Sequence, residues 1–409
     1  MFHEILVIGG GASGIMASIA SKDIGKDIGL LEGSNRIGTK ILTTGNGRCN
    51  ISNKNINYSR YHSMNSEFYK YVLDKFTVED TINFFNSLGL PLTELDNGKL
   101  YPLSLQASSV LDILRMALED RNIPIYLNEK VKSIKKTSSY FEIISQSGNT
   151  YECKRLILCC GGKSAPSTGS DGSGFQLAKS LNHSIVNPIP ALVQLKLKYN
   201  YLKALSGVKF NGFAEIYIDD LPKRKEFGEI LFTDYGISGP PILQISSIAS
   251  YALSTKKEVK LFIDMMPNFN KESLIEFLEN HWGLLSYRSV YDSFIGIINK
   301  KIIPILLKEA SVSNIHKSCC ELSWKEKQKI FSLLKSWSFL VCDTNSFKNS
   351  QVTSGGINTK EVNPKTLESK IIKNLFFAGE ILDVDGDCGG FNLQWCWSSG
   401  FIAAKSAAD

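Results

Sequence analysis

Three glycines near the N-terminus, Gly9, Gly11 and Gly14, follow a short apolar run and open a stretch with helical periodicity. The run from Glu4 to Ile8 is rich in β-branched residues, and apolar residues then recur at helical spacing over 15–20. Such a turn needs glycine for its tight curvature, for the close approach of a pyrophosphate and for packing of the helix on the strand. The N–H groups of the helix N-terminus then face the phosphates. The pattern predicts a dinucleotide site; the alternative is a glycine-rich turn in some other α/β fold.

A second apolar run, from Ile28 to Leu31, ends in Glu32. An acidic residue about 20 residues beyond such glycines accepts the ribose hydroxyls of the nucleotide and disfavours a 2′-phosphate there. The site therefore suits FAD or NAD better than NADP. Ser13, inside the glycine motif, is also expected to contact the cofactor.

A polar loop from Thr43 to Asn50 favours FAD over NAD. It reads Thr-Thr-Gly-Asn-Gly-Arg-Cys-Asn and follows Lys40, and it holds too many glycines and amides for a core strand. A loop of this composition can lie flat against a large planar ligand. The alternative is a solvated surface loop.

The C-terminus carries a second set of motifs, from Ala378 to Glu380, from Asp383 to Gly386 and from Gly389 to Asn392. The run from Leu375 to Ala378 predicts a short buried strand, so the glutamate that follows would emerge at the carboxyl edge of a sheet, where ligands bind. The residues after the last motif predict a closing helix rich in serine and alanine. Its N-terminus would direct N–H groups at a reduced flavin ring, unless the helix only caps the sheet.

Together these motifs resemble the HI0933-like family of flavoproteins. The similarity covers essentially the whole chain and includes Gly228–Thr233, Gly236–Pro240 and Thr353–Gly356. It implies an α/β fold with a Rossmann-type FAD-binding domain like that of glutathione reductase. The family usually has a glycine at the position of Asn46 and a small hydroxyl residue at that of Cys388, so this chain departs from the pattern at both.

The resemblance also implies a set of FAD contacts. At the ADP half they are Gly9, Gly11, Ser13, Gly14 and Glu32, and beside the isoalloxazine they are Lys40, Gly45, Asn46, Gly47, Arg48, Cys49 and Asn50. In the C-terminal segment they are Gly379, Glu380, Asp385, Gly390, Asn392 and Leu393, and Val131, Gly161, Gly162 and Gly355 complete the set.

The pattern along the chain predicts one domain interrupted by another. Alternating strands and helices predict the first part of the FAD-binding domain over residues 1–190, and the chain returns to this domain over 351–409. A β-rich insertion is expected over 191–240 and again over 321–350. Between its two parts we expect a helical subdomain over 241–320, a candidate lid or substrate wall.

Composition fits an intracellular enzyme with several domains. The 409 residues are 43% apolar and 21% charged, enough to bury a large core. The net charge of +6 comes from scattered lysines, so we expect no nucleic-acid partner. The nine cysteines and five histidines lack metal-ligand spacing, so no metal is predicted. No apolar run approaches transmembrane length, so we expect a cytoplasmic location without membrane contact; the oligomeric state is open.

The chain lacks a second G-x-G-x-x-G motif in its middle. NADH or NADPH, as a possible transient electron donor, would therefore bind without its own Rossmann domain, and the flavin would react directly with a small organic substrate. Arg48 is a candidate to hold a substrate carbonyl or carboxylate, Cys49 to donate a proton and Tyr235 to line the cleft. The alternatives are that Arg48 pairs with a phosphate, Cys49 only packs and Tyr235 is a domain contact.

Three functions fit this prediction. The first is an NAD(P)H-linked reductase of a carbon–carbon double bond conjugated to a ketone, because the family includes reductases of unsaturated 3-oxo bile acids. The second is an aminoacetone or other amine oxidase that forms hydrogen peroxide, since the family also includes such oxidases. The third is an FAD-bound RNA-modifying protein, which needs a basic stripe that the dispersed charge does not show.

Overall fold

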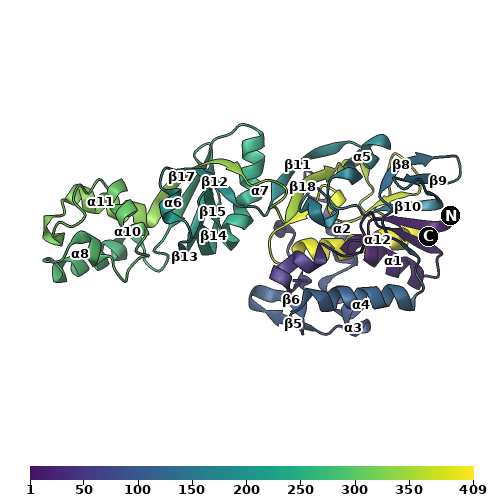
Figure 1. Ribbon diagram of the computed structural model, residues 1–409, viewed down its shortest axis with the longest axis horizontal. Helices are drawn as coiled ribbons and strands as arrows, with labels where there is room; N and C mark the ends of the chain where they lie inside the picture. Colours follow the sequence, from purple (N-terminus) through teal and green to yellow (C-terminus); the bar gives the residue numbers. More distant parts are fainter. The chain divides into compact units, whose positions relative to one another are not determined.

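The computed structural model describes residues 1–409, and the chain divides into two compact units. Unit 1 comprises Met1–Pro190 and Ser350–Asp409, and unit 2 comprises Ala191–Asn349. Each unit has its own hydrophobic core, so unit 2 interrupts unit 1 in sequence and packs on its own (Figure 1).

A mixed sheet forms the centre of unit 1. Its strands are β1 (Phe2–Ile8), β2 (Ile28–Leu31), β7 (Ile125–Tyr126), β8 (Val131–Lys136), β9 (Phe141–Ser145), β10 (Thr150–Leu158) and β19 (Leu375–Phe377). The order is β7-β2-β1-β10-β9-β8, with β19 also paired to β10. The pairs from β7 to β1, and those of β10 with β1 and β19, are parallel, whereas β8 and β9 form an antiparallel extension of β10. The Rossmann-type fold expected from the sequence is confirmed.

Strand β10 brings the two ends of the chain together. At its carboxyl end Leu158 is paired with Ile8 of β1 on one side and with Phe377 of β19 on the other. Because all three strands are parallel, the loops that follow them leave the sheet at the same edge. The N-terminal glycine motif and the C-terminal Gly-Glu motif therefore start side by side.

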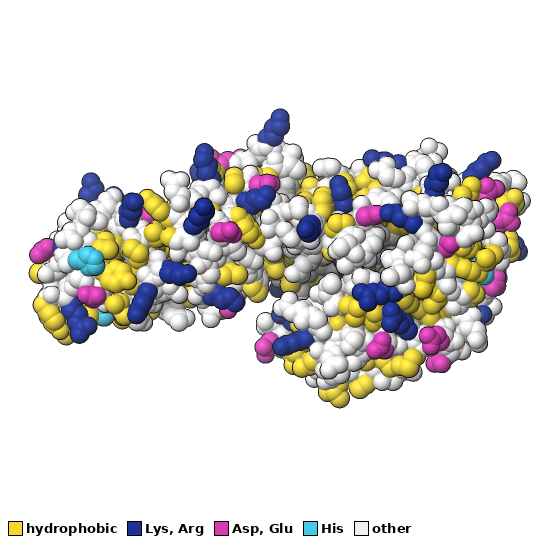
Figure 2. Space-filling view, in the orientation of Figure 1, with side chains coloured by type: hydrophobic (Ala, Val, Ile, Leu, Met, Phe, Trp, Pro, Cys, Tyr) yellow, Lys and Arg dark blue, Asp and Glu magenta, His cyan; other side chains and the backbone are white.

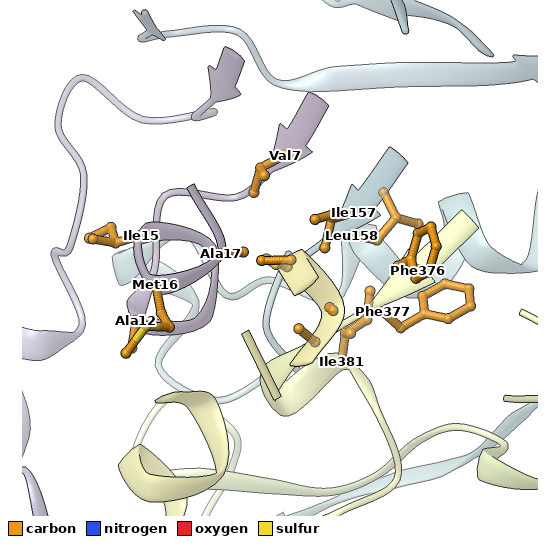
Figure 3. Close-up of a cluster of buried hydrophobic side chains, with 14 of the residues drawn as sticks. Val7, Ala12, Ile15, Met16, Ala17, Ile157, Leu158, Phe376, Phe377 and Ile381 are labelled. Atoms are coloured by element: carbon orange, nitrogen blue, oxygen red, sulfur yellow. The ribbon is translucent and has the colours of Figure 1, made fainter. Parts of the chain in front are cut away.

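Two helices, α1 (Ala12–Asp23) and α12 (Phe391–Ala408), pack against each other on this sheet (Figure 1). Buried side chains of β1, α1, β10 and β19 gather in one cluster, among them Val7, Ala17, Ile157 and Phe377 (Figure 3). The helices approach closely because Gly400 lacks a side chain: a Cβ there would lie 2.4 Å from the carbonyl oxygen of Ser13.

The other elements of unit 1 surround this core. The helices are α2 (Phe68–Lys75), α3 (Val78–Ser87), α4 (Ala107–Asp120) and α5 (Ser173–Ser180). The small sheets pair β3 (Ser52–Asn53), β6 (Lys99–Pro102) and β5 (Leu92–Leu95); β4 (Tyr61–His62) and β20 (Asp385–Gly386); and β11 (Ile185–Ala191) and β18 (Val352–Ile357).

Unit 2 is built on a closed antiparallel barrel. In order around the barrel, the strands are β12 (Leu195–Lys198), β15 (Gly236–Ser238), β14 (Leu221–Phe232), β13 (Lys209–Ile218), β16 (Val259–Asp264) and β17 (Trp337–Thr344). The helices are α6 (Leu202–Leu205), α7 (Pro240–Ser254), α8 (Lys271–Leu284), α9 (Val290–Ser293), α10 (Ile302–Glu309) and α11 (Trp324–Ser336). None of the helices of the chain is both long enough and apolar enough to cross a bilayer.

The structure differs from the expected subdivision of the insertion in two places. Strand β16 lies within 241–320, expected to be helical, because its alternating residues pair with β13 and β17 and close the barrel. Helix α11 lies within 321–350, expected to be β-rich. Between the short helices α9 and α10, Gly296 adopts φ +94°, a left-handed conformation that interrupts a helix.

The close approach of α1 and α12 predicts the effect of a single methyl group. Gly400→Ala should lower the free energy of unfolding by about 1–3 kcal/mol, because its Cβ would overlap the Ser13 carbonyl oxygen. Gly283→Ala in α8 is the matched control, since nothing lies within 4 Å of a Cβ there; it should be neutral or stabilising by up to about 1 kcal/mol. Urea unfolding of the two variants and the wild type checks this, and equal effects would contradict the packing described.

Candidate functional site

The glycine turn after β1 combines two packed glycines with one open glycine. Gly9 has φ +106°, and a Cβ there would lie 2.4 Å from the carbonyl oxygen of Cys159. A Cβ at Gly14 would lie 1.8 Å from the carbonyl oxygen of Gly9. Nothing lies within 4 Å of the same position at Gly11, the N-cap of α1. The chain's own packing thus requires the outer glycines, while the space at Gly11 is open for a phosphate to approach the N–H groups of α1.

Glu32 lies directly after β2, and hydrogen bonds hold its carboxylate beside the glycine turn. Its Oε2 accepts from the backbone N–H of Gly10 at 2.8 Å. Its Oε1 accepts from the backbone N–H and the hydroxyl of Ser34 at 2.7 and 2.5 Å. A carboxylate has about four acceptor positions, so Glu32 can also accept from a ribose hydroxyl at this edge of the sheet.

A hydrogen-bonded network joins Lys40, Thr353 and Glu380, three segments far apart in sequence. The Nζ of Lys40 lies 2.6 Å from Oε2 of Glu380, and the other carboxylate oxygen accepts from the N–H of Thr353 at 2.8 Å. The hydroxyl oxygen of Thr353 in turn accepts from the N–H groups of Lys163 and Ser164 at 2.7 and 3.0 Å. Lys40 and Glu380, expected as cofactor contacts, therefore bind each other and join the loop after β2 to the C-terminal segment.

The glycine-rich loop is an irregular 3₁₀ segment, η1 (Ile41–Gly47), with several left-handed residues. Gly45, Asn46 and Gly47 have φ values of +56°, +54° and +80°, and Cys49 has +58°. Asparagine tolerates this conformation better than other residues with a Cβ, which explains how Asn46 replaces the glycine usual in the family. The neighbouring Arg48 is exposed.

Cys49 points into the protein. Its side chain is fully buried in the apolar core of unit 1. Burial raises the pKa of the Cys49 thiol to about 12, against a smaller opposing effect of its hydrogen bond with Thr44. The thiol keeps its proton at neutral pH, and this position favours the packing role over proton donation.

Three buried oxygens of unit 1 near the predicted contacts have no hydrogen-bond partner within the protein: Oγ of Ser170, Oδ1 of Asn50 and Oδ1 of Asp385. A Cβ at Gly161 would lie 2.9 Å from the Ser170 oxygen, and one at Gly390 would lie 3.0 Å from the Asn50 oxygen. A buried acceptor without a donor costs about 1–3 kcal/mol. The site thus fits a bound group with hydroxyl or N–H donors, which the ribityl chain and pyrimidine ring of FAD provide.

Asp385 on β20 is the most strongly perturbed acid of the site. It is 2% exposed, and burial raises the pKa of its carboxyl to about 7, although the charge of His62 and a hydrogen bond from Ser354 oppose the change. The neighbouring Asp387 accepts from Arg60 and His62 at 3.1 and 3.0 Å. Asp385 therefore holds its proton more strongly than an ordinary carboxyl does.

The N-terminus of α12 comes directly after the loop that follows β20. Gly390, its N-cap, has φ +98°, and a Cβ there would lie 2.4 Å from the carbonyl oxygen of Ser52. The amide of Asn392 binds the preceding loop, accepting from the N–H of Gly386 at 2.8 Å and donating to its carbonyl at 2.7 Å. Leu393 packs against the core. The first N–H groups of α12 have no partner within the helix and can face a ligand.

Several other expected contact residues serve the packing of the protein itself. A Cβ at Gly162 would lie 2.4 Å from the Thr353 hydroxyl, and one at Gly379 would lie 2.4 Å from the Ser13 hydroxyl. A Cβ at Gly355 would lie 2.6 Å from the carbonyl oxygen of Asn187 on β11. Whether these glycines also contact the cofactor stays a prediction.

Two further expected residues belong to other elements of the chain. Val131 is the buried first residue of β8. Tyr235 belongs to unit 2, between β14 and β15, and is 38% exposed. No group of three or more His, Cys, Asp or Glu side chains in the chain is arranged to hold a metal ion.

Three residues of the site were not predicted from the sequence. They are Thr353 at the centre of its hydrogen-bonded network, His62 beside Asp387, and Tyr101. Tyr101, on β6, packs against the glycine-rich loop, with its Cε1 3.3 Å from the position of a Cβ at Gly45. The Thr353 motif is visible in the sequence, but its partners lie far away along the chain. Tyr101 and His62 belong to no motif that a single sequence reveals.

The sheet edge, the glycine turn and the C-terminal loop define a Rossmann-type FAD-binding oxidoreductase. The chain belongs to the HI0933-like family, whose Rossmann-domain model matches residues 3–406. The resemblance inferred from the motifs is confirmed.

Curated relatives align over the full length. A 3-dehydro-bile acid delta(4,6)-reductase of Clostridium scindens is 39% identical over 411 residues, covering 100% of this chain and 99% of that protein. A ribosomal RNA dihydrouridine synthase of Haemophilus influenzae is 28% identical, covering 99% and 98%. Among solved structures, a 3-ketosteroid-delta4-(5alpha)-dehydrogenase of Rhodococcus jostii has a TM-score of 0.49 and 13% identity, covering 100% of this chain and 97% of that one, a likeness too weak to bear on function.

The raised pKa of Asp385 predicts a pH-dependent stability. The folded-state pKa of about 7 lies above the unfolded value near 4, so the protonated carboxyl stabilises the fold below about pH 4 and this contribution is lost as the pH rises to about 7. Relative to Asp385→Asn, which cannot ionise, the FAD-free wild type should lose about 1.4 kcal/mol of unfolding free energy per pH unit in this window. Urea unfolding of both proteins across the window measures the difference, and parallel curves would rule out this titration.

Proposed function

We propose that this protein is an NAD(P)H-linked reductase that saturates a carbon–carbon double bond conjugated to a ketone in a small apolar substrate of the 3-oxo-4-ene bile-acid type. The observation that carries the proposal is the 39% identity to a 3-dehydro-bile acid delta(4,6)-reductase over all of this chain. The alignment includes unit 2, the part of the chain in which family members are expected to differ by substrate.

The described residues support the cofactor part of this reaction. FAD, when bound, supplies hydride chemistry at N5 of its reduced ring. Glu32, held beside the glycine turn by the N–H of Gly10, would accept from a ribose hydroxyl, and the phosphates would approach the N-terminus of α1 at the open position of Gly11. The N-terminus of α12 favours negative charge beside it and would stabilise a negatively charged ring there.

The substrate contacts are part of the proposal. Arg48 is exposed on the glycine-rich loop, and its guanidinium would hold the ketone oxygen and stabilise the negative charge that develops there. Tyr235, partly exposed in unit 2, would line the substrate cleft. Cys49 would support the loop from the core side, as its burial favours.

A second candidate, an RNA-modifying reductase, shares the reaction class. The relative named as a ribosomal RNA dihydrouridine synthase aligns over 99% of this chain at 28% identity. Dihydrouracil differs from uracil by two hydrogens across the C5–C6 bond, which is conjugated to the C4 carbonyl. The two candidates therefore require the same hydride and proton additions and differ in the size and charge of the substrate.

The distribution of charge bears on the choice between a small-molecule substrate and RNA. The positive excess lies in unit 2, with 21 Lys and Arg against 16 Asp and Glu, while unit 1 has 25 against 24. Several of the unit 2 lysines pair with acids, including Lys317 with Glu326 and Lys335 with Asp264. On the face shown in Figure 2 most basic side chains are scattered, with a few close together over unit 1, and they form no continuous stripe. An RNA backbone favours a continuous basic surface, so the small-molecule substrate is preferred.

An anaerobic absorbance titration separates these candidates. NADH or NADPH should bleach the flavin of the FAD-loaded protein, and a 3-oxo-4-ene steroid should then restore the colour faster than air does. Colour restored only by a ribosomal RNA fragment would favour the second candidate. Bleaching by aminoacetone with peroxide formed in air would identify the oxidase, and failure to take up FAD would contradict every candidate.

A further inference from the structure

Tyr101 is fixed to the same part of unit 1 that carries the glycine-rich loop. Strand β6 pairs with β3, so the carbonyl of Leu100 accepts from the N–H of Ile51 at 2.8 Å, next to Asn50. The Tyr101 ring lies 3.3 Å from the position of a Cβ at Gly45, and the same position lies 2.9 Å from the backbone nitrogen of Asn50. The ring is thus packed against the glycine-rich loop. The buried Oδ1 of Asn50 in this loop has no hydrogen-bond partner within the protein and can accept from a bound group.

The hydroxyl of Tyr101 has no hydrogen-bond partner within the protein, in contrast to those of Tyr61, Tyr69 and Tyr126. Tyr61 donates to the carbonyl of Phe391 at 3.0 Å, Tyr69 to that of Tyr61 at 3.1 Å, and Tyr126 lies 3.0 Å from a ring nitrogen of His3. Those hydroxyls serve the fold. The Tyr101 hydroxyl is free to bind a ligand, and its side chain is only partly exposed.

The groups around Tyr101 suit proton donation. Burial raises the pKa of Tyr101, with the nearby Cys388 adding to the effect and the charge of Arg48 opposing it. The hydroxyl is therefore protonated at neutral pH, and Arg48 can stabilise the phenolate that remains after transfer. The other titratable groups nearby are less suited: Arg48 cannot release a proton, and the thiol of Cys49 is fully buried.

We propose that Tyr101 is the proton donor of the reduction. This inference rests on the proposed function. As the β-carbon of the enone receives a hydride from the reduced cofactor, the electron pair of the double bond moves to the α-carbon and takes the proton of the Tyr101 hydroxyl. A new C–H bond forms at each carbon, the cofactor is oxidised by two electrons, and solvent returns a proton to the phenolate.

Tyr101→Phe tests the inference in the FAD-loaded full chain. The variant should take up FAD and be bleached by NAD(P)H at the wild-type rate, because the ring and the loop are unchanged. Its reoxidation by a 3-oxo-4-ene steroid should slow by about 100-fold or more, the usual size of a general-acid contribution. The solvent deuterium isotope effect on reoxidation should differ between the wild type and the variant, because water replaces the tyrosine hydroxyl as the proton source.

Two further variants complete the test. Tyr140→Phe, at the turn before β9, removes a hydroxyl far along the chain from the loop and should behave as wild type. Cys388→Ala should retain fast reoxidation if Tyr101 is the donor, since it removes a second proton-bearing side chain close to Tyr101.

The outcomes are distinguishable. A Tyr101→Phe variant that reoxidises at the wild-type rate with an unchanged isotope effect overturns the inference alone. A variant that no longer takes up FAD also overturns it and assigns Tyr101 to cofactor binding. A wild type that no enone reoxidises overturns the proposed function, and the inference falls with it.

Discussion

The parallel pairing of β10 with both β1 and β19 is the constraint on which the rest of unit 1 depends. Leu158 lies between Ile8 and Phe377, so strands from the two ends of the chain share one neighbour. Their loops leave the sheet at one edge, and there Lys40 and Glu380 form an ion pair at 2.6 Å. A cofactor site assembled from both ends of the chain requires the two segments of unit 1 to fold together, although unit 2 separates them in sequence.

Glycine has two separate uses at this edge. Gly9, Gly14 and Gly379 have neighbours that a Cβ would overlap, so the packing of the protein alone requires glycine there. Gly11 and Gly47 have nothing within 4 Å of a Cβ, and glycine at these positions leaves space beside the turn and the loop. The oxygens of Asn50, Asp385 and Ser170 that lack a partner belong to loops of the same unit. Open backbone together with unsatisfied acceptors is what a site for a polar dinucleotide requires.

Much of this architecture is visible in the sequence because it rests on local patterns. The buried run Ile28–Leu31 predicts β2 with the bounds it has. Strand β16, within the range expected to be helical, was missed because its partners β13 and β17 come from other parts of the sequence.

The partners of the site residues could not be predicted. Glu380 and Lys40 are separated by 340 positions, and one sequence carries no information on such a pairing. The same holds for Thr353 and for Tyr101, whose importance comes from the loop it packs against. The exposure of Arg48 and the burial of Cys49 also follow from backbone conformation rather than from residue type, because neighbouring residues of this irregular loop point in different directions.

The most direct test of the central claim is amide hydrogen exchange of the FAD-free and FAD-loaded protein, followed by peptide mass spectrometry. If both ends of the chain build one site, FAD should slow exchange in peptides that cover 9–14 and in peptides that cover 385–394. Protection confined to the N-terminal peptides, with 385–394 exchanging at the FAD-free rate, would contradict a site closed by the C-terminal segment.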